Sequence, residues 1–332
     1  MSRRRLLAAG GALGVSAAVP ACSDSGSGTG AESDGDGWSF KDDRGRAVKA
    51  DARPERIVAY VGSAAALHDY GVDCTAVFGP ATYSDGRRTP QAGSLDVKKL
   101  DSVGVQAGTF NIEKFASLRP DLLVSNMNQP KRLWQVPDEG ADKIESLAPS
   151  VAITTSGVSL LHPIQRYAAL AEALGADLKA PRVAEAERRF ETAAERLRRV
   201  AGAKKDLKVL AVATQAENLY VGAPGMFPDT RYFDELGVGF VHPEKPAAPG
   251  FWELVSWENA DLYPADVIFA DQRSNNLPLK EVAKTKGTWN RLPAVRAGQV
   301  VPWNNEAQFS YAGYAPLVER LADALEKARK VT

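Results

Sequence analysis

The apolar positions from residue 38 onward form two alternating patterns, short continuous runs and longer runs with helical spacing. Residues 57–61 are typical of a strand, residues 63–70 predict a helix that Gly71 ends, and residues 74–78 predict the next strand. Further apolar runs predict strands at 121–124, 151–153, 208–212, 267–269 and 300–301. Short strands that are apolar throughout suit mostly parallel sheets that are covered on both faces. The sequence therefore predicts an α/β fold.

The longest helical pattern lies near the middle of the chain, at residues 181–200. On its polar face, Glu185 with Arg189 and Glu195 with Arg199 have the spacing of helical ion pairs. No Gly, Ser or Pro follows Pro181 in this segment, so its composition differs from that of a flexible linker. The apolar stripe of the helix consists of Val183, Ala186, Phe190, Ala193, Leu197 and Val200.

This pattern predicts two α/β lobes joined by a single long helix. We expect the N-terminal lobe at residues 41–160, the region of the inter-lobe helix at 161–204 and the C-terminal lobe at 205–332.

The first residues of the chain have the pattern of an export signal. Three arginines at positions 3–5 precede a stretch without charge that ends on small residues before Cys22. Residues 2–7, Ser-Arg-Arg-Arg-Leu-Leu, also resemble a twin-arginine signal, and either that route or the general route fits. Residues 22–40 are rich in Gly, Ser and Asp, as in a flexible tether. We expect a signal peptide at 1–21, a lipid on Cys22 and an extracytoplasmic protein anchored to the cell membrane.

Composition argues against several classes of function. The 41 basic and 41 acidic residues cancel, so net charge does not favour nucleic acid as a partner. Cys74 has no intrachain partner if Cys22 carries a lipid. The three histidines lie at unrelated positions, unlike the ligands of a zinc or manganese site. Sequence motifs for a nucleophile elbow, a phosphate-binding loop or a Cys-x-x-Cys pair are missing, so we expect a protein that is not an enzyme.

The two halves of the chain share a short acidic pattern. Glu113 precedes Asp121 by eight residues, and Glu258 precedes Asp266 by the same interval. In each half, a residue that favours the N-cap position starts a short helix with the glutamate in its first turn, and the aspartate leads into a buried strand. Either glutamate alone could simply complement its helix dipole. The matched pair instead favours equivalent surface positions on two similar lobes.

These features together resemble the iron-siderophore and vitamin B12 substrate-binding proteins (class III) of ABC importers. The resemblance covers roughly residues 42–325 and includes the signal with its lipid cysteine, the segments 54–58, 111–115 and 118–123, the long helix and the segment 252–271. It implies two lobes joined by one rigid helix, a ligand cleft between the lobes with little hinge closure, and docking on a permease dimer. We expect a monomer. In that family a glutamate on each lobe binds permease arginines, and the matching residues are Glu113 and Glu258.

Ligand-binding residues are expected just beyond the strand ends, where open α/β sheets bind ligands. Aromatic side chains would supply contact area, and arginines would donate hydrogen bonds to ligand oxygens, although each of these residues also has a packing or surface explanation. Arg132 and Trp134 follow a strand end too, but we rank them lower. The candidates are Tyr60, Tyr83, Arg87, Arg88, Asn126, Tyr220, Trp252, Arg273, Asn275, Trp303 and Tyr311, among which the family resemblance supports Trp252 most directly.

The resemblance implies a ferric siderophore as ligand, with the iron carried inside the ligand and no cofactor on the protein. Haem or a corrinoid is the alternative within the family, and an exported enzyme or an adhesion module is the alternative outside it. Frequent Arg and Ala residues, with the twin-arginine lipoprotein signal, indicate a GC-rich actinobacterial source. A hydroxamate of the ferrioxamine type is therefore the first ligand to test, although the net charge does not distinguish it from a catecholate.

Overall fold

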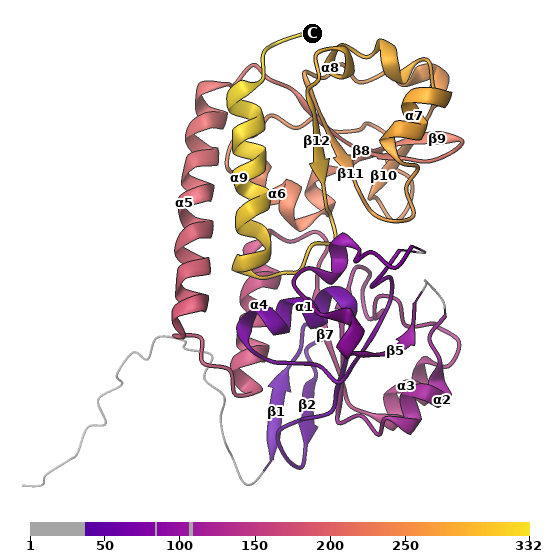
Figure 1. The fold of residues 1–332 in the computed structure, drawn as a ribbon, viewed down its shortest axis with the longest axis vertical. Coiled ribbons are helices and arrows are strands. Elements are labelled where there is room, and N and C mark those ends of the chain that lie inside the picture. Colours follow the sequence, from indigo (N-terminus) through magenta and orange to yellow (C-terminus); the bar gives the residue numbers. More distant parts are fainter. Residues whose placement is uncertain (1–36, 84, 106–108) are drawn as a thin grey trace, which may run out of the picture. The chain divides into compact units, whose positions relative to one another are not determined.

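Two five-stranded sheets form the centres of two α/β lobes, as Figure 1 shows, which confirms the predicted fold class. This computed structural model describes residues 37–83, 85–105 and 109–332. The described residues belong to one compact unit. The predicted signal peptide, Cys22 and most of the tether lie outside the described residues. In the described part of the chain, no helix is both long and apolar enough to cross a membrane.

The sheet of the N-terminal lobe is parallel throughout, in the order β5-β4-β3-β6-β7. Every residue of β3, β4 and β6 is buried, as the continuous apolar runs predict. The helix α1 ends at Gly71, which adopts a left-handed conformation with φ of 101° and donates to the carbonyl of His68. The elements are β3 (Ile57–Tyr60), α1 (Val61–Tyr70), β4 (Ala76–Phe78), η1 (Pro90–Ala92), η2 (Val97–Lys99), β5 (Asp101–Gly104), α2 (Ile112–Ser117), β6 (Leu122–Met127), α3 (Ala141–Leu147), β7 (Ser150–Thr154) and α4 (Leu161–Ala173).

An antiparallel hairpin, β1 (Trp38–Lys41) with β2 (Ala47–Ala50), precedes this sheet and was not predicted. A buried ion pair holds its turn, because Arg44 Nε donates to Asp42 at 2.6 Å while the other end of the guanidinium donates to Ser150 on β7. Asp43 next to it accepts hydrogen bonds from Arg166 on α4 and from the backbone of Thr154. The hairpin is thereby fixed to the edge of the N-terminal sheet.

The sheet of the C-terminal lobe has the order β10-β9-β8-β11-β12 and is mixed. Strands β8, β11 and β12 are parallel, whereas β9 and β10 form an antiparallel edge that sequence patterning missed. The elements are β8 (Val209–Thr214), β9 (Asn218–Gly222), η3 (Pro224–Met226), α6 (Pro228–Glu235), β10 (Trp252–Ser256), η4 (Trp257–Asn259), β11 (Val267–Asp271), α7 (Leu279–Thr285), η5 (Trp289–Arg291), α8 (Pro293–Arg296), β12 (Val300–Trp303) and α9 (Tyr311–Lys327).

The long helix α5 (Pro181–Ala203) runs between the lobes, and α9 lies beside it over most of its length (Figure 1). Its buried face includes Phe190 and Leu197 of the predicted stripe, while Ala186 and Val200 are only half buried. The predicted pair of Glu185 with Arg189 is wrong. Arg189 instead makes a bidentate pair with Glu319 of α9, at 2.6 and 2.7 Å, because α9 covers that side of the helix.

The two aspartates of the repeated acidic pattern have the same structural role. Asp121 accepts a hydrogen bond from the backbone of Arg56, which immediately precedes β3, and Asp266 accepts one from the backbone of Lys208, which immediately precedes β8. Both distances are 2.9 Å. Each carboxylate thus links the start of one buried strand to the start of its parallel neighbour, which explains the matched spacing in the two halves.

Asp229 is a buried carboxylate in the C-terminal lobe, between α6 and the end of β12. Asp229, in the first turn of α6, is 1% exposed and accepts hydrogen bonds from the indole of Trp303 and the backbone of Thr230, both at 2.7 Å. Burial raises the pKa of Asp229 to about 7, because the two hydrogen bonds recover only part of the solvation lost by the charged form.

Replacing Phe190 by alanine should lower the free energy of unfolding by about 3 to 5 kcal/mol. The ring is 1% exposed and lies against Tyr232 of α6 and Tyr311 of α9, so its loss opens a cavity between three helices. Urea denaturation measures the effect, with Glu195→Ala on the exposed face of α5 as the matched control. Equal midpoints and slopes for both variants would contradict this packing.

Replacing Asp229 by asparagine should remove a pH dependence of stability. A folded-state pKa raised above the unfolded value gives stability that is complete below the unfolded pKa and is lost as pH rises through about 7. Wild type should therefore lose up to about 4 kcal/mol relative to Asp229→Asn between acidic and mildly alkaline pH. Denaturation of both proteins across that range is the measurement, and a difference that does not change with pH would refute the assignment.

Candidate functional site: a cavity between the lobes

A cavity of about 310 Å³ lies between the lobes, at the carboxyl ends of the parallel strands. Asn126 is the second-last residue of β6, and Thr155 directly follows β7. Arg273 follows β11, and Glu306 follows β12. Open α/β sheets bind ligands at this edge, and here the corresponding edges of both sheets contribute. The lining residues are Asn126, Asn128, Gln129, Trp134, Thr155, Tyr220, Phe227, Pro228, Ala247, Ala248, Pro249, Phe251, Trp252, Leu254, Arg273, Asn305, Glu306 and Phe309.

Aromatic rings form one wall of this cavity. Trp252, at the start of β10, packs edge-on against Phe227 at 4.9 Å between ring centroids and against Tyr220 at 6.3 Å. Trp252 pairs across the sheet with Gly222, whose missing side chain leaves room for the indole, since a Cβ there would lie 3.3 Å from the ring. Neighbouring strands therefore hold Trp252 and Tyr220 in place, and Phe227 packs against Trp252 from the turn before α6.

Arg273 carries the positive charge of the cavity wall. Its Nε donates to Asp271 Oδ2 at 2.7 Å, and its Nη1 donates to Glu306 Oε1 at 2.6 Å. The guanidinium also lies 6.0 Å from the centroid of the Trp252 ring. Burial opposes the charge of Arg273, but the two carboxylates outweigh it and raise the pKa of the arginine, so this side chain stays protonated.

The same network reaches the N-terminal lobe through Glu306. Its second oxygen accepts a hydrogen bond from the hydroxyl of Tyr60, the last residue of β3. Burial and the neighbouring charge of Glu306 raise the pKa of Tyr60 well above its usual value, which keeps the phenol protonated as a donor. Asp271, Arg273, Glu306 and Tyr60 thus form one continuous chain of hydrogen bonds from the C-terminal to the N-terminal sheet.

The cavity also contains two buried amide side chains. Asn126 accepts hydrogen bonds at Oδ1 from the hydroxyl of Tyr167 at 2.5 Å, which positions its amide at the cavity edge. Asn305 is 6% exposed, and its Oδ1 has no hydrogen-bond partner among the described residues. A buried carbonyl oxygen without a donor is costly, so this atom is suited to accept a hydrogen bond from a bound ligand.

The structure brings together only some of the residues that the sequence predicted for ligand binding. Asn126, Tyr220, Trp252 and Arg273 line the cavity, as does Trp134, which we had ranked lower. Tyr60 is completely buried and contacts the wall through Glu306.

The other candidates lie elsewhere. Tyr83 and Trp303 line a separate hollow of about 410 Å³, and the indole N–H of Trp303 is bound by Asp229. Tyr311, on α9, packs against Phe190 of α5. The side chains of Arg87, Arg88, Arg132 and Asn275 are exposed and do not line the inter-lobe cavity; Arg87 pairs with Asp85, Arg132 pairs with Asp138 and Arg88 donates to the carbonyl of Leu95.

Sequence analysis missed Glu306, Asn305 and Phe309, which lie in the segment between β12 and α9. The rule that ligands bind beyond strand ends could have found them, because residues 300–301 were already predicted as a strand. Sequence analysis also missed Phe227 and Phe251, because neither residue lies just after the carboxyl end of a strand. These rings reach the cavity through the turn before α6 and the loop before β10.

Glu113 and Glu258 are both exposed and neither lines the inter-lobe cavity. Asn111 caps the helix of Glu113 by accepting a hydrogen bond from the backbone of Lys114, as predicted. Ser256 makes no such cap in η4. Hydrogen bonds from the backbone N–H of Glu258 itself and from the hydroxyl of Ser256 instead lower the pKa of Glu258.

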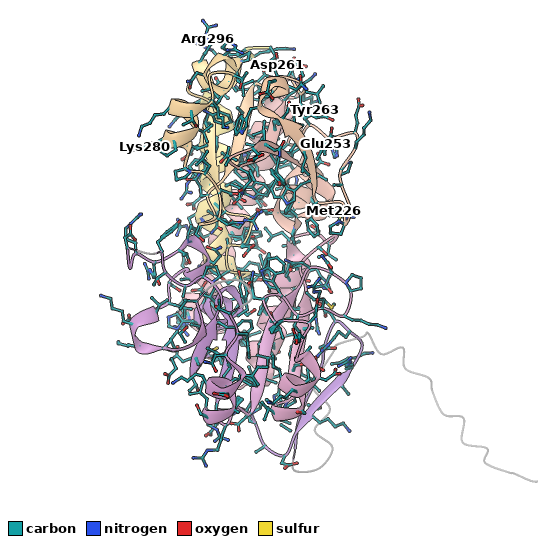
Figure 2. The ribbon with its side chains drawn as sticks, turned by 90° about the vertical axis from the view of Figure 1, so that its right-hand side faces the viewer. Met226, Glu253, Asp261, Tyr263, Lys280 and Arg296 are labelled. Carbon is teal, nitrogen blue, oxygen red and sulfur yellow. The ribbon has the colours of Figure 1, made fainter. Side chains whose placement is uncertain are left out.

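The elements near the two glutamates lie away from the contact between the lobes. Figure 1 shows α2 on the side of the N-terminal lobe opposite α5 and α9. Asp261, three residues after Glu258, lies at the end of the C-terminal lobe that is far from the N-terminal lobe, near Tyr263 (Figure 2). A further cavity of about 520 Å³ beside Glu258 is lined by Asp261 and Tyr263.

Comparison with known proteins places this arrangement in a family. Residues 58–307 match the family model described as periplasmic binding protein. The crystal structure of DesE, a ferric-siderophore receptor protein from Streptomyces coelicolor, is 47% identical, with a TM-score of 0.86 over 89% of this chain and 100% of that one. The petrobactin-binding protein YclQ from Bacillus subtilis shares the fold, with a TM-score of 0.65 and 18% identity over 88% of this chain and 99% of its own.

Among curated proteins, the Fe(3+)-citrate-binding protein YfmC of Bacillus subtilis is 21% identical over 93% of this chain and 92% of that protein. The family match covers most of both lobes, including the strands whose ends form the cavity and the residues Trp252, Arg273 and Glu306. The chain therefore belongs to the periplasmic binding protein family.

Proposed function

We propose that the protein is an extracytoplasmic binding protein, not an enzyme, that captures a ferric siderophore of the hydroxamate type and delivers it to an ABC permease. The observation that carries this proposal is the composition of the inter-lobe cavity. It combines an aromatic wall with one arginine whose charge two carboxylates offset. The 47% identity with a ferric-siderophore receptor supports the same ligand class.

Charge favours a hydroxamate over a catecholate. A ferric tricatecholate carries three negative charges, and its recognition calls for several unpaired cations, whereas three hydroxamates neutralise ferric iron. In this cavity Arg273 is the only cation among the described lining residues, and Asp271 and Glu306 both bind it. The summed formal charge of these three groups is negative. A neutral or cationic complex therefore meets no electrostatic penalty here, while an anionic one does.

The remaining groups match the surface of such a ligand. Trp252 and Tyr220 offer ring surface to the hydrocarbon linkers between the hydroxamates. Arg273 has five N–H donors, of which the bonds with Asp271 and Glu306 use two, so it can also donate to an iron-bound oxygen. Asn305 Oδ1 can accept from an amide N–H of the linker. The iron would arrive already saturated by the ligand's own oxygens.

Quenching of tryptophan fluorescence tests the ligand class, because Trp252 and Trp134 line the cavity. The panel should contain a ferric trihydroxamate, a ferric tricatecholate, ferric citrate, haem and cobalamin. We expect saturable quenching at equimolar ratio with the iron-loaded trihydroxamate. Tight binding of ferric citrate and none of the trihydroxamate would overturn the proposed ligand and favour the ligand named for YfmC.

Replacing Trp252 by alanine should weaken binding of the ferric trihydroxamate by about 1 to 3 kcal/mol, because an indole ring of the cavity wall is lost. Isothermal titration calorimetry, which does not depend on the removed fluorophore, measures the change. Leu262→Ala is the control, since Leu262 is an exposed apolar residue that does not line this cavity. An affinity equal to that of wild type would return Trp252 to a purely structural role.

We further propose that Glu113 and Glu258 dock the protein on arginines of the permease and that a lipid on Cys22 anchors it to the membrane. The docking proposal rests on the two exposed carboxylates at equivalent places of the two lobes, both outside the ligand cavity. Carboxylates recognise arginine forks through paired, charge-assisted hydrogen bonds. Two widely separated contacts would also fix the orientation of the binding protein. The anchor rests on the sequence before and after Cys22 alone.

The double variant Glu113→Arg with Glu258→Arg should abolish siderophore uptake in cells while the purified protein binds its ligand as wild type does. Charge reversal replaces attraction by repulsion at both contacts and leaves the cavity unchanged. Uptake of radioactive iron in a strain deleted for the native gene is the measurement. The double variant Glu139→Arg with Glu217→Arg, at exposed sites, serves as the charge-matched control. Normal uptake by the first variant at native expression would refute the docking assignment.

A further inference from the structure

We infer that Glu306 is a specificity-determining residue, whose carboxylate offsets the charge of Arg273 and so makes the cavity reject anionic ferric complexes. This inference rests on the proposed function, because it names which ferric complexes the same cavity admits. It starts from the position of Glu306 in the segment between β12 and α9, where its side chain lines the cavity and is 12% exposed.

Two carboxylates bind Arg273, but their positions differ. Asp271 is completely buried behind the arginine, where it binds Nε at 2.7 Å and the backbone N–H of the same residue at 3.1 Å. Asp271 therefore binds Arg273 at a different nitrogen from Glu306. Asp271 does not line the cavity, whereas Glu306 does. Glu306 is therefore the carboxylate that a ligand meets.

The charge count gives Glu306 its effect. Arg273 with Asp271 alone forms a neutral pair. The remaining N–H donors of Arg273 would then attract an anionic ligand, because Asp271 lies behind the arginine and not in the cavity. With Glu306 added at 2.6 Å from Nη1, the group carries one net negative charge. Tyr60 adds no charge, because the pKa of its phenol is raised well above the usual value. The sign of the field that a ligand meets thus depends on a single side chain.

Glu306→Gln changes the charge with little change of shape. The amide oxygen can still accept from Arg273 Nη1, and the amide nitrogen can donate to the Tyr60 oxygen, whose hydroxyl both donates and accepts. The link between the lobes can therefore persist in this variant. Any change in ligand preference then reports on charge and not on a displaced loop.

The experiment compares a neutral ferric trihydroxamate with two anionic complexes, ferric citrate and a ferric tricatecholate, by calorimetric titration of the wild type and of Glu306→Gln. Wild type should bind the neutral complex most tightly. In the variant, the affinity for the anionic complexes relative to the neutral one should rise by about tenfold or more, which corresponds to ~1.4 kcal/mol. The gain should diminish at high salt, since part of the cavity is open to solvent.

Two controls separate charge from structure. Glu306→Asp keeps the charge and should keep the preference of the wild type. Tyr60→Phe removes the hydrogen bond to Glu306 but leaves the charge of Glu306, so the ratio of the affinities should stay the same even where the affinities themselves change. If Glu306→Gln proves unstable in thermal denaturation, Glu306→Ala makes the same charge change and takes its place.

The outcomes distinguish the two levels of the proposal. If wild type binds the neutral trihydroxamate and the ratio does not change in Glu306→Gln and Glu306→Ala, the role of Glu306 is refuted while the proposed function stands. If wild type binds none of the ferric complexes, the proposed function itself fails. A ratio that shifts equally in Tyr60→Phe would assign the effect to the position of the loop and would also overturn the inference.

Discussion

The chain of hydrogen bonds from Asp271 through Arg273 and Glu306 to Tyr60 is the interaction on which the site depends. A guanidinium with only 15% of its side chain exposed must be compensated, and the two carboxylates that do so come from the ends of neighbouring parallel strands. Because Glu306 also binds Tyr60 at the end of β3, satisfying this one charge connects the sheets of both lobes. Arg273 and Glu306 also line the cavity, so inter-lobe geometry and the shape of the cavity are physically linked.

The packed helices α5, α6 and α9 restrict how the two sheets can move relative to each other. Phe190 of α5 packs between Tyr232 of α6 and Tyr311 of α9, and salt bridges from Arg189 and Arg196 to α9 run along the same contact. A connection of this kind resists bending, because a hinge would have to separate packed rings as well as exposed ion pairs. Small adjustments of loops at the cavity are therefore easier than a large rotation of one lobe.

The repeated acidic pattern combines a structural aspartate with an exposed glutamate in each lobe. Asp121 and Asp266 are structural, since each binds the backbone just before the neighbouring strand. Glu113 and Glu258 make no comparable connection within their sheets and remain exposed. The aspartate fixes the start of the strand in both lobes, and the glutamate is carried to an equivalent surface position because it is eight residues earlier. The matched spacing thus places one exposed glutamate in each lobe.

The sequence by itself determined the α/β class, the two lobes and the long helix, because apolar runs and helical periodicity report directly on which residues are buried. It also identified Trp252, Tyr220, Asn126 and Arg273, since the ends of parallel strands meet at one edge of a sheet. Tertiary structure decided the rest. The antiparallel edge of β9 and β10 depends on pairing that local patterns do not encode, and the hairpin β1–β2 depends on ion pairs with β7 and α4. Sequence patterns missed Glu306, and they did not show that Trp303 and Arg87 lie outside the inter-lobe cavity. The reason is the same in each case, because only the packing of both lobes fixes which carboxylate, ring or cation lies beside a side chain.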